Sequence, residues 1–182
     1  MKRKSAYKEI CKLTFAAAAI GAFSAPAAEA VEIKDVLDSY VEATVLPTYS
    51  QMSDSAIEFN KAVAKLKESA SDENLAKAAA AWSKVRTSWE RSEAFLFGPA
   101  AFASLDPNLD SWPLDQSQLD GLIKAVNEGR VAIDAGYVRG GLGAAFRGFH
   151  AAEYLLFREG KVRKASEISK GELEYLAALA QV

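Results

Sequence analysis

From residue 32 onward, apolar side chains recur at the three- and four-residue spacing of an α-helix. In the first long pattern, residues 32–69, Val36, Leu37 and Tyr40 begin one apolar stripe. Pro47 should kink or split this helix, because proline removes a backbone donor and clashes with the preceding turn. No segment alternates apolar and polar residues over a useful length, so strands are not expected. The spacing therefore predicts an all-α fold, a helical bundle.

Residues that start or stop helices divide the rest of the pattern. Asp72 is a candidate N-cap for a second helix, which should run to about Phe97 and stop at a Gly-Pro step. Three prolines within residues 98–114 predict a loop there. Two pairs match the capping box that opens a helix, Asp115 with Gln118 and Ser169 with Glu172. A further helix should carry residues 148–157.

The last helix presents an apolar stripe of Leu173, Leu176, Ala177 and Ala180. No later segment of the sequence follows to cover this stripe. Exposed apolar patches mark interaction sites or aggregation-prone surfaces. We therefore expect the chain to self-associate through an exposed C-terminal helix or to depend on a partner.

The first thirty residues have the three parts of a secretory signal peptide. Residues 1–4 begin a basic start, and the apolar run at 13–23 is too short to span a bilayer. Ala28-Glu29-Ala30 then fits the small-x-small cleavage pattern. We predict a signal peptide at residues 1–30 and an exported helical domain at residues 31–182.

The charge balance excludes one class of partner and favours another. The formal net charge is −2, whereas nucleic-acid binding usually needs a basic face. Cys11 is the only cysteine and would leave with the signal peptide, so the mature chain would have no thiolate ligand. An acidic, cysteine-free, exported chain is compatible with cation binding through oxygen ligands.

The stretch GFHAAEYLLF holds the only histidine, His150, with Glu153 three residues later on the same helix face. The helical arc places Glu153 among phenylalanines, where an ionised carboxylate needs compensation. A cation shared by the imidazole and the carboxylate would supply it. Alternatively, the pair forms only an intrahelical hydrogen bond, or Arg147 neutralises Glu153. One imidazole cannot build the zinc-protease or di-iron motifs, which need a second histidine.

A second stretch, WSKVRTSWERSEAFLFGP, carries carboxylates on the same helical stripe as aromatic residues. Glu90 and Glu93 share a face, and Trp89 and Arg86 lie beside them. The two carboxylates could give two oxygens to a hard cation, or they could pair with arginines. Asp110, in the LDSWP stretch with Trp112, lies on a predicted loop, where a carboxylate can be aimed back at a site.

Several of these stretches together resemble the imelysin family. GFHAAEYLLF is similar to its G-x-H-x-x-E signature, at Gly148, His150 and Glu153. WSKVRTSWERSEAFLFGP, LDSWPLD, FREGKVR and SKGELEYLAALA resemble other marked segments, so that the resemblance runs from about residue 32 to the end.

The resemblance implies an exported bacterial protein of the periplasm or cell envelope, built as two related helical halves with the functional site between them. Family members were named as insulin-cleaving metallopeptidases, and relatives serve iron uptake or bind metal. The resemblance carries metal binding onto a set of five residues: His150, Glu153, Glu90, Glu93 and Asp110. This sequence stops where the second half would begin, so it corresponds to a first half and is expected to be truncated.

Three functions follow as hypotheses. The first is an exported metal-binding protein that acts in iron or metal acquisition together with iron-uptake components of the envelope. Its oxygen-rich ligands suit Fe(III), Mn(II) or Ca(II) better than zinc, and iron is favoured, with zinc or calcium as alternatives. The second is a metallopeptidase, which needs an open metal position and a general base. The third is a structural or peptide-binding helical module in which His150 and Glu153 only hydrogen-bond.

Overall fold

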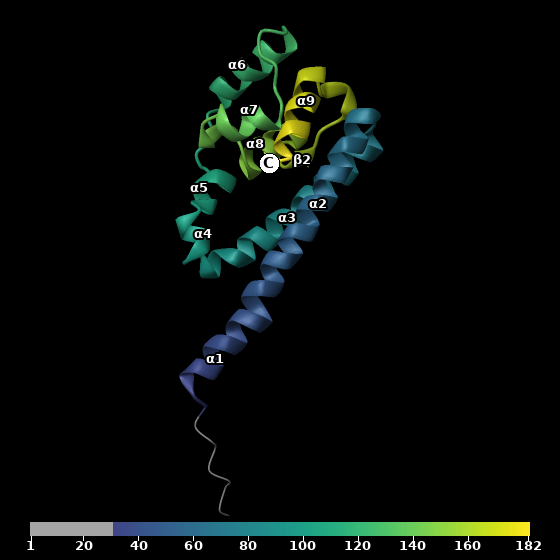
Figure 1. Cartoon of the computed structure of the whole chain (residues 1–182). Coiled ribbons are helices and arrows are strands. Elements are labelled where there is room, and N and C mark those ends of the chain that lie inside the picture. The colour runs from purple at the N-terminus through teal and green to yellow at the C-terminus, as the bar shows by residue number, and fades with distance from the viewer. Residues whose placement is uncertain (1–30) are drawn as a thin grey trace, which may run out of the picture.

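The computed structural model describes residues 31–182, so the predicted signal peptide lies outside the described residues. Helices make up nearly all of the regular structure, which confirms the all-α prediction. A long rod forms the frame (Figure 1), in which α1 (Ile33–Tyr40), the π-helical η1 (Val41–Val45) and α2 (Leu46–Glu68) follow one another without a break. α3 (Asp72–Ser92) then returns along α2. None of the described helices combines the length and apolar character needed to cross a membrane.

Pro47 accounts for the change of helix type within the rod. It lies in the first turn of α2, directly after the π-helical residues of η1. A wider π-helical turn accommodates a residue that cannot donate to the preceding turn. The helix type therefore changes just before Pro47, but the predicted kink is absent, because the chain keeps its direction (Figure 1).

The remaining elements are short and lie to one side of the α2–α3 hairpin (Figure 1). They are η2 (Glu93–Phe95), α4 (Pro99–Phe102), α5 (Leu105–Leu109), α6 (Gln116–Asn127), α7 (Ala135–Gly140), η3 (Ala144–Phe146), α8 (Phe149–Leu156), β1 (Phe157–Arg158), β2 (Lys161–Val162), η4 (Ala165–Glu167) and α9 (Lys170–Leu179). The two strands pair antiparallel, with Phe157 opposite Val162. The loop predicted for residues 98–114 is wrong in part, because this segment contains α4 and α5.

The helix caps follow the sequence with one correction. Asp115 accepts a hydrogen bond from the Gln118 amide, and Ser169 forms the predicted capping box that opens α9. α3, however, is capped by Ser71 rather than Asp72, since the Ser71 hydroxyl accepts from the amide of Asn74. α3 also ends before Phe97, in the 3₁₀ turn η2.

The apolar core forms where α2, α3, α8 and α9 meet. Trp89, Tyr175 and Leu176 are fully buried in it. Because α9 packs against α2, α6 and α8, elements earlier in the chain cover its apolar stripe. The expectation of an exposed C-terminal helix is therefore wrong. Large exposed apolar side chains lie instead on α1, no residue of which is buried.

Candidate metal centre

A close approach between the end of α5 and the turn before α8 positions the site. Gly148 has a φ of +81°, and a Cβ built on it would lie 2.3 Å from the carbonyl oxygen of Leu109. Only glycine fits here, because it adopts positive φ readily and leaves room for the neighbouring backbone. The contact brings Asp110, the residue after α5, beside His150 on the first turn of α8.

The single histidine contacts two carboxylates. His150 Nε2 lies 3.0 Å from Asp110 Oδ1, and His150 Nδ1 lies 3.1 Å from Glu153 Oε2. A ring with one proton can donate to only one of these oxygens, whereas a protonated ring donates to both. The Trp112 ring packs against the imidazole with 4.7 Å between the ring centroids. The structure therefore contains the predicted His150–Glu153 pair and extends it to Asp110.

Glu153 is not buried among phenylalanines, contrary to the helical-arc expectation. Its side chain is 46% exposed. This edge of α8 faces an open cleft of about 570 Å³, whose lining includes Trp82, Trp112, Tyr154 and Phe157. Arg147, the alternative partner considered for Glu153, instead donates to the carbonyl of Arg139. Solvent reaches Glu153, so this carboxylate does not need a bound cation to balance its charge.

Asp110 is the residue at which the contacts of the site meet. Its side chain is only 8% exposed. Oδ1 accepts a hydrogen bond from Arg86, and Oδ2 accepts one from Trp89 Nε1 at 2.8 Å. Burial alone would raise the pKa of Asp110, but the hydrogen bonds from Arg86 and Trp89 outweigh it and lower that pKa. Asp110 is therefore held as a carboxylate.

Arg86 connects Asp110 to the next predicted carboxylate, Glu90. The guanidinium lies 2.5 Å from Glu90 Oε1, one turn further along α3, and 5.2 Å from the centre of the Phe149 ring. The arginine pairing considered as the alternative for Glu90 is thus present. Arg86 offsets part of the negative charge that surrounds it.

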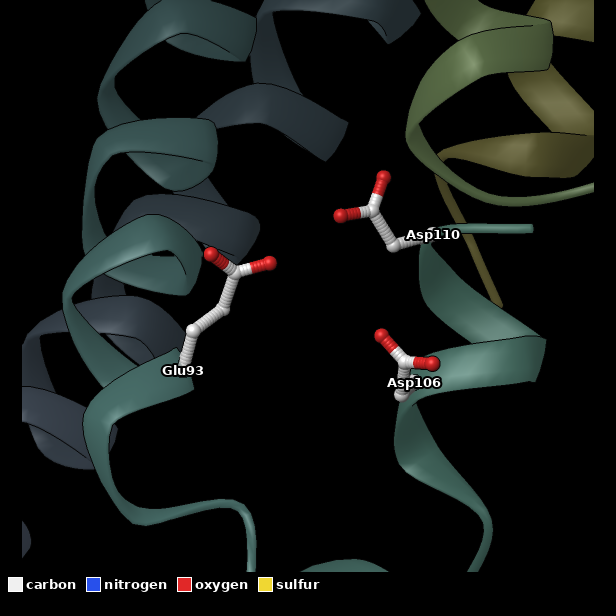
Figure 2. Close-up of side chains that lie close together, drawn as sticks. All are labelled: Glu93, Asp106 and Asp110. Atoms are coloured by element: carbon white, nitrogen blue, oxygen red, sulfur yellow. The ribbon is translucent and has the colours of Figure 1, made fainter. Parts of the chain in front are cut away.

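Three carboxylates converge beside this network, and we call Glu93, Asp106 and Asp110 the acidic cluster. One oxygen from each lies within 4.8 Å of the others. Figure 2 shows Glu93, from the turn after α3, facing Asp106 and Asp110 on and after α5. Burial raises the pKa of Glu93, and the charges of Glu90 and Asp110 raise it further against the effect of Arg86. Negative charge is therefore in excess here.

Asp106 is the member of the cluster that sequence reasoning missed. It lies on α5, where a loop was predicted, and it is four residues before Asp110. Residues four apart lie on one face of a helix, so a helical interpretation of LDPNLD would have indicated the pair. The prolines on either side favoured a loop and concealed it.

The acidic cluster fits a hard cation. Carboxylate oxygens are the ligands that Ca(II), Mn(II) and Fe(III) prefer, and a bound cation would offset the negative charge that the three carboxylates bring together. Glu93 and Asp106 are exposed, so their side chains can turn toward an ion. Asp110 is held in place by Arg86, Trp89 and His150, the kind of support that ligating carboxylates receive.

Comparisons of sequence identify relatives. The family model described as imelysin, peptidase M75, matches residues 45–182. A protein of Synechococcus elongatus named iron-regulated protein A is 28% identical over 152 residues, which are 84% of this chain and 38% of that protein.

Solved structures share the fold. A protein of Parabacteroides distasonis described as an iron-regulated protein A precursor is 38% identical, with a TM-score of 0.70 over 86% of this chain and 44% of that one. An imelysin peptidase from Bacteroides ovatus is 38% identical, with a TM-score of 0.59 over 71% of this chain and 37% of that one. An imelysin-like protein of Psychrobacter arcticum, 17% identical over 85% of this chain and 48% of that one, has the same fold at a TM-score of 0.66. The chain spans less than half the length of each of these relatives.

Proposed function

The chain belongs to the imelysin family, and we propose that it binds a metal ion at the acidic cluster and acts in iron acquisition. One observation carries the proposal, the convergence of three carboxylate oxygens within 4.8 Å of one another. Groups that repel one another and are placed together gain most from a shared cation. The proposed role is binding, because it needs only the ligands that this chain brings together.

The ligands in this proposal are Glu93, Asp106 and Asp110. His150 is a positioning residue, because its imidazole contacts Asp110 and Glu153 at the same time. Arg86 has a similar role and also keeps the site from being too negative when no ion is bound. In this proposal His150, first considered as a ligand, orients Asp110 of the cluster, and Glu153 contacts the other nitrogen of the same imidazole.

Two grounds favour iron as the metal. Relatives of the chain are named iron-regulated protein A, and an all-carboxylate set suits Fe(III). Mn(II) and Ca(II) prefer the same oxygen ligands, and the site lacks the imidazole or thiolate ligands typical of zinc. Competition experiments between these ions would rank their affinities for the acidic cluster.

Export belongs to the same proposal. The signal-peptide pattern at residues 1–30 and the precursor description of the Parabacteroides relative support a location in the bacterial periplasm or cell envelope. There the protein would deliver metal to iron-uptake components. N-terminal sequencing of the protein from an envelope fraction should begin after Ala30. A chain that begins at Met1 in the cytosol would contradict export.

Calorimetric titration of the purified protein tests metal binding. Citrate-buffered Fe(III), Mn(II), Ca(II) and Zn(II) are titrated separately, and one saturable site is expected. Asp106→Asn removes an exposed cluster carboxylate and should weaken binding by about tenfold or more. Glu73→Gln is the matched control, because it removes the same charge about 30 Å away at the other end of α3. Equal affinities for the two variants would contradict the proposed site.

A further inference from the structure

A second arginine, Arg147, has no acidic partner in the part of the chain that the structure describes. Its Nη1 donates to the Arg139 carbonyl at 2.6 Å, and its Nη2 donates to the side-chain oxygen of Asn108. Its Nε is closed off from solvent and has no hydrogen-bond partner. Both of these partners are neutral, so neither of them balances the positive charge of Arg147. The side chain is partly buried, and an anion beside the guanidinium would balance its charge.

An apolar cavity of about 160 Å³ lies against this arginine. Its walls come from α2, α3, α7, α8 and α9 and include Met52, Phe59, Val85, Val138, Phe149 and Ala152. Arg147 and Asn108 provide its polar edge. A cavity of about 150 Å³ with walls of this kind accommodates a benzene ring. The space therefore matches a ring or a short branched chain, with a cation at one side.

We propose that this cavity binds a small carboxylic acid with an apolar body about the size of a benzene ring. The body would fill the space between Phe59 and Phe149, and the carboxylate would accept hydrogen bonds from the Arg147 guanidinium. Nη1 and Nη2 each use one N–H group on a protein partner, which leaves one N–H on each of these two nitrogens for the ligand. Arginine is suited to such paired contacts with carboxylates.

This site is separate from the proposed metal centre. Arg147 and His150 lie on either side of Gly148, whose backbone packs on Leu109. The residues that line the cavity do not include His150 or any member of the acidic cluster. The cavity is proposed to bind an anion and the acidic cluster a cation. An experiment can therefore disprove binding at one site without affecting the evidence for the other.

A fluorine NMR titration of metal-free protein with 4-fluorobenzoate tests the inference. Saturable binding is expected for the wild type, and 4-fluorobenzamide, which has the same shape without the charge, should bind about tenfold more weakly or not at all. Arg147→Met should lose the benzoate affinity by a similar factor. Arg139→Met is the matched control, because it removes an exposed charge on α7 but leaves the carbonyl that Arg147 contacts.

The wild-type comparison of benzoate with benzamide does not depend on any variant folding. Ala56→Phe adds a second test, since it fills the cavity from an exposed position on α2 and leaves Arg147 in place. It should abolish binding while the circular dichroism spectrum is unchanged. The absence of saturable benzoate binding to the wild type, equal binding of the amide, or full affinity in Ala56→Phe would each overturn the inference.

Discussion

His150 Nε2 and Asp110 Oδ1 lie 3.0 Å apart, and this contact joins the histidine helix to the acidic cluster. It exists because Gly148 lets the start of α8 lie directly on the backbone of Leu109. The glycine and the histidine of the G-x-H-x-x-E pattern therefore act together: one sets the distance between two elements, and the other contacts the aspartate across it.

Substituting Gly148 by alanine should destabilise the protein more than the same change at Gly160. Both glycines have positive φ, so each substitution should cost about 1 kcal/mol for the backbone alone. At Gly148 the new Cβ would also meet the Leu109 carbonyl at 2.3 Å, whereas nothing lies within 4 Å at Gly160. Urea denaturation measures the difference. Equal losses of stability would show that the close approach to α5 does not exist in solution.

Glu93→Gln should stabilise the metal-free protein while it weakens metal binding. The raised pKa means that Glu93 holds its proton more tightly in the folded than in the unfolded protein. Ionisation of Glu93 therefore lowers the stability of the fold as the pH rises through the pKa of the unfolded and then of the folded state. Removing the charge should add roughly 0.5 kcal/mol or less at pH 7, because the side chain is exposed to screening solvent. Thermal denaturation provides the readout. Glu73→Gln should add nothing, since pairing with Lys77 lowers the pKa of Glu73.

Arg86→Met should remove a pH-dependent part of the stability. The pKa of Asp110 is lowered in the fold, so its contribution is fully present above the unfolded value of about 3.9 and is lost as pH falls through the folded value. Without Arg86 the protein should lose about 2 kcal/mol near pH 7. The difference in stability between wild type and Arg86→Met should become smaller as the pH falls toward about 3.

Thermal denaturation of the metal-free wild type and Arg86→Met, at several pH values from about 7 down to about 3, measures this difference in stability. Lys84→Met is the control, because Lys84 lies on the same helix and its ion pair with Glu58 is exposed. A gap of constant size across the pH range would mean that Arg86 does not act through a titrating carboxylate.

Leu176→Ala should destabilise the chain strongly, because α9 is part of its core. Leu176 is fully buried, and truncating such a residue typically costs about 2–5 kcal/mol. Leu37→Ala makes the same change at a side chain that is 58% exposed and should cost under about 0.5 kcal/mol. Urea denaturation compares the two. A small loss of stability for Leu176→Ala would show that other helices do not cover α9 in solution.

Local signals in the sequence predicted much of the fold, whereas long-range contacts decided the rest. The capping box at Ser169 and the change of helix type before Pro47 depend on neighbouring residues, and the capping box appears where the pattern predicts it. The burial of Leu176 depends on helices far away in the chain, which no local pattern reveals. The packing direction of Glu153 was misjudged for the same reason, since a helical arc does not say which side faces a cleft.

The candidate site shows the same division. Proximity of His150 to one of the predicted carboxylates was expected, and Asp110 is that residue. Asp106 was missed because its proline neighbours favoured a loop over the short helix α5. Asp110 is positioned opposite Glu93 by its hydrogen bonds from Arg86 and Trp89 of α3, which are far from it in the chain and belong to no single motif (Figure 2).

The position of a bound ion shows whether the acidic cluster is a metal site. Crystals grown with Fe(III) or Mn(II) and measured at the absorption edge of the metal give an anomalous map that shows each ion. We expect one strong peak among the carboxylate oxygens of Glu93, Asp106 and Asp110, at about 2.0–2.6 Å from them. A peak between His150 and Glu153 with none at the acidic cluster, or no ordered metal at saturating concentration, would contradict it.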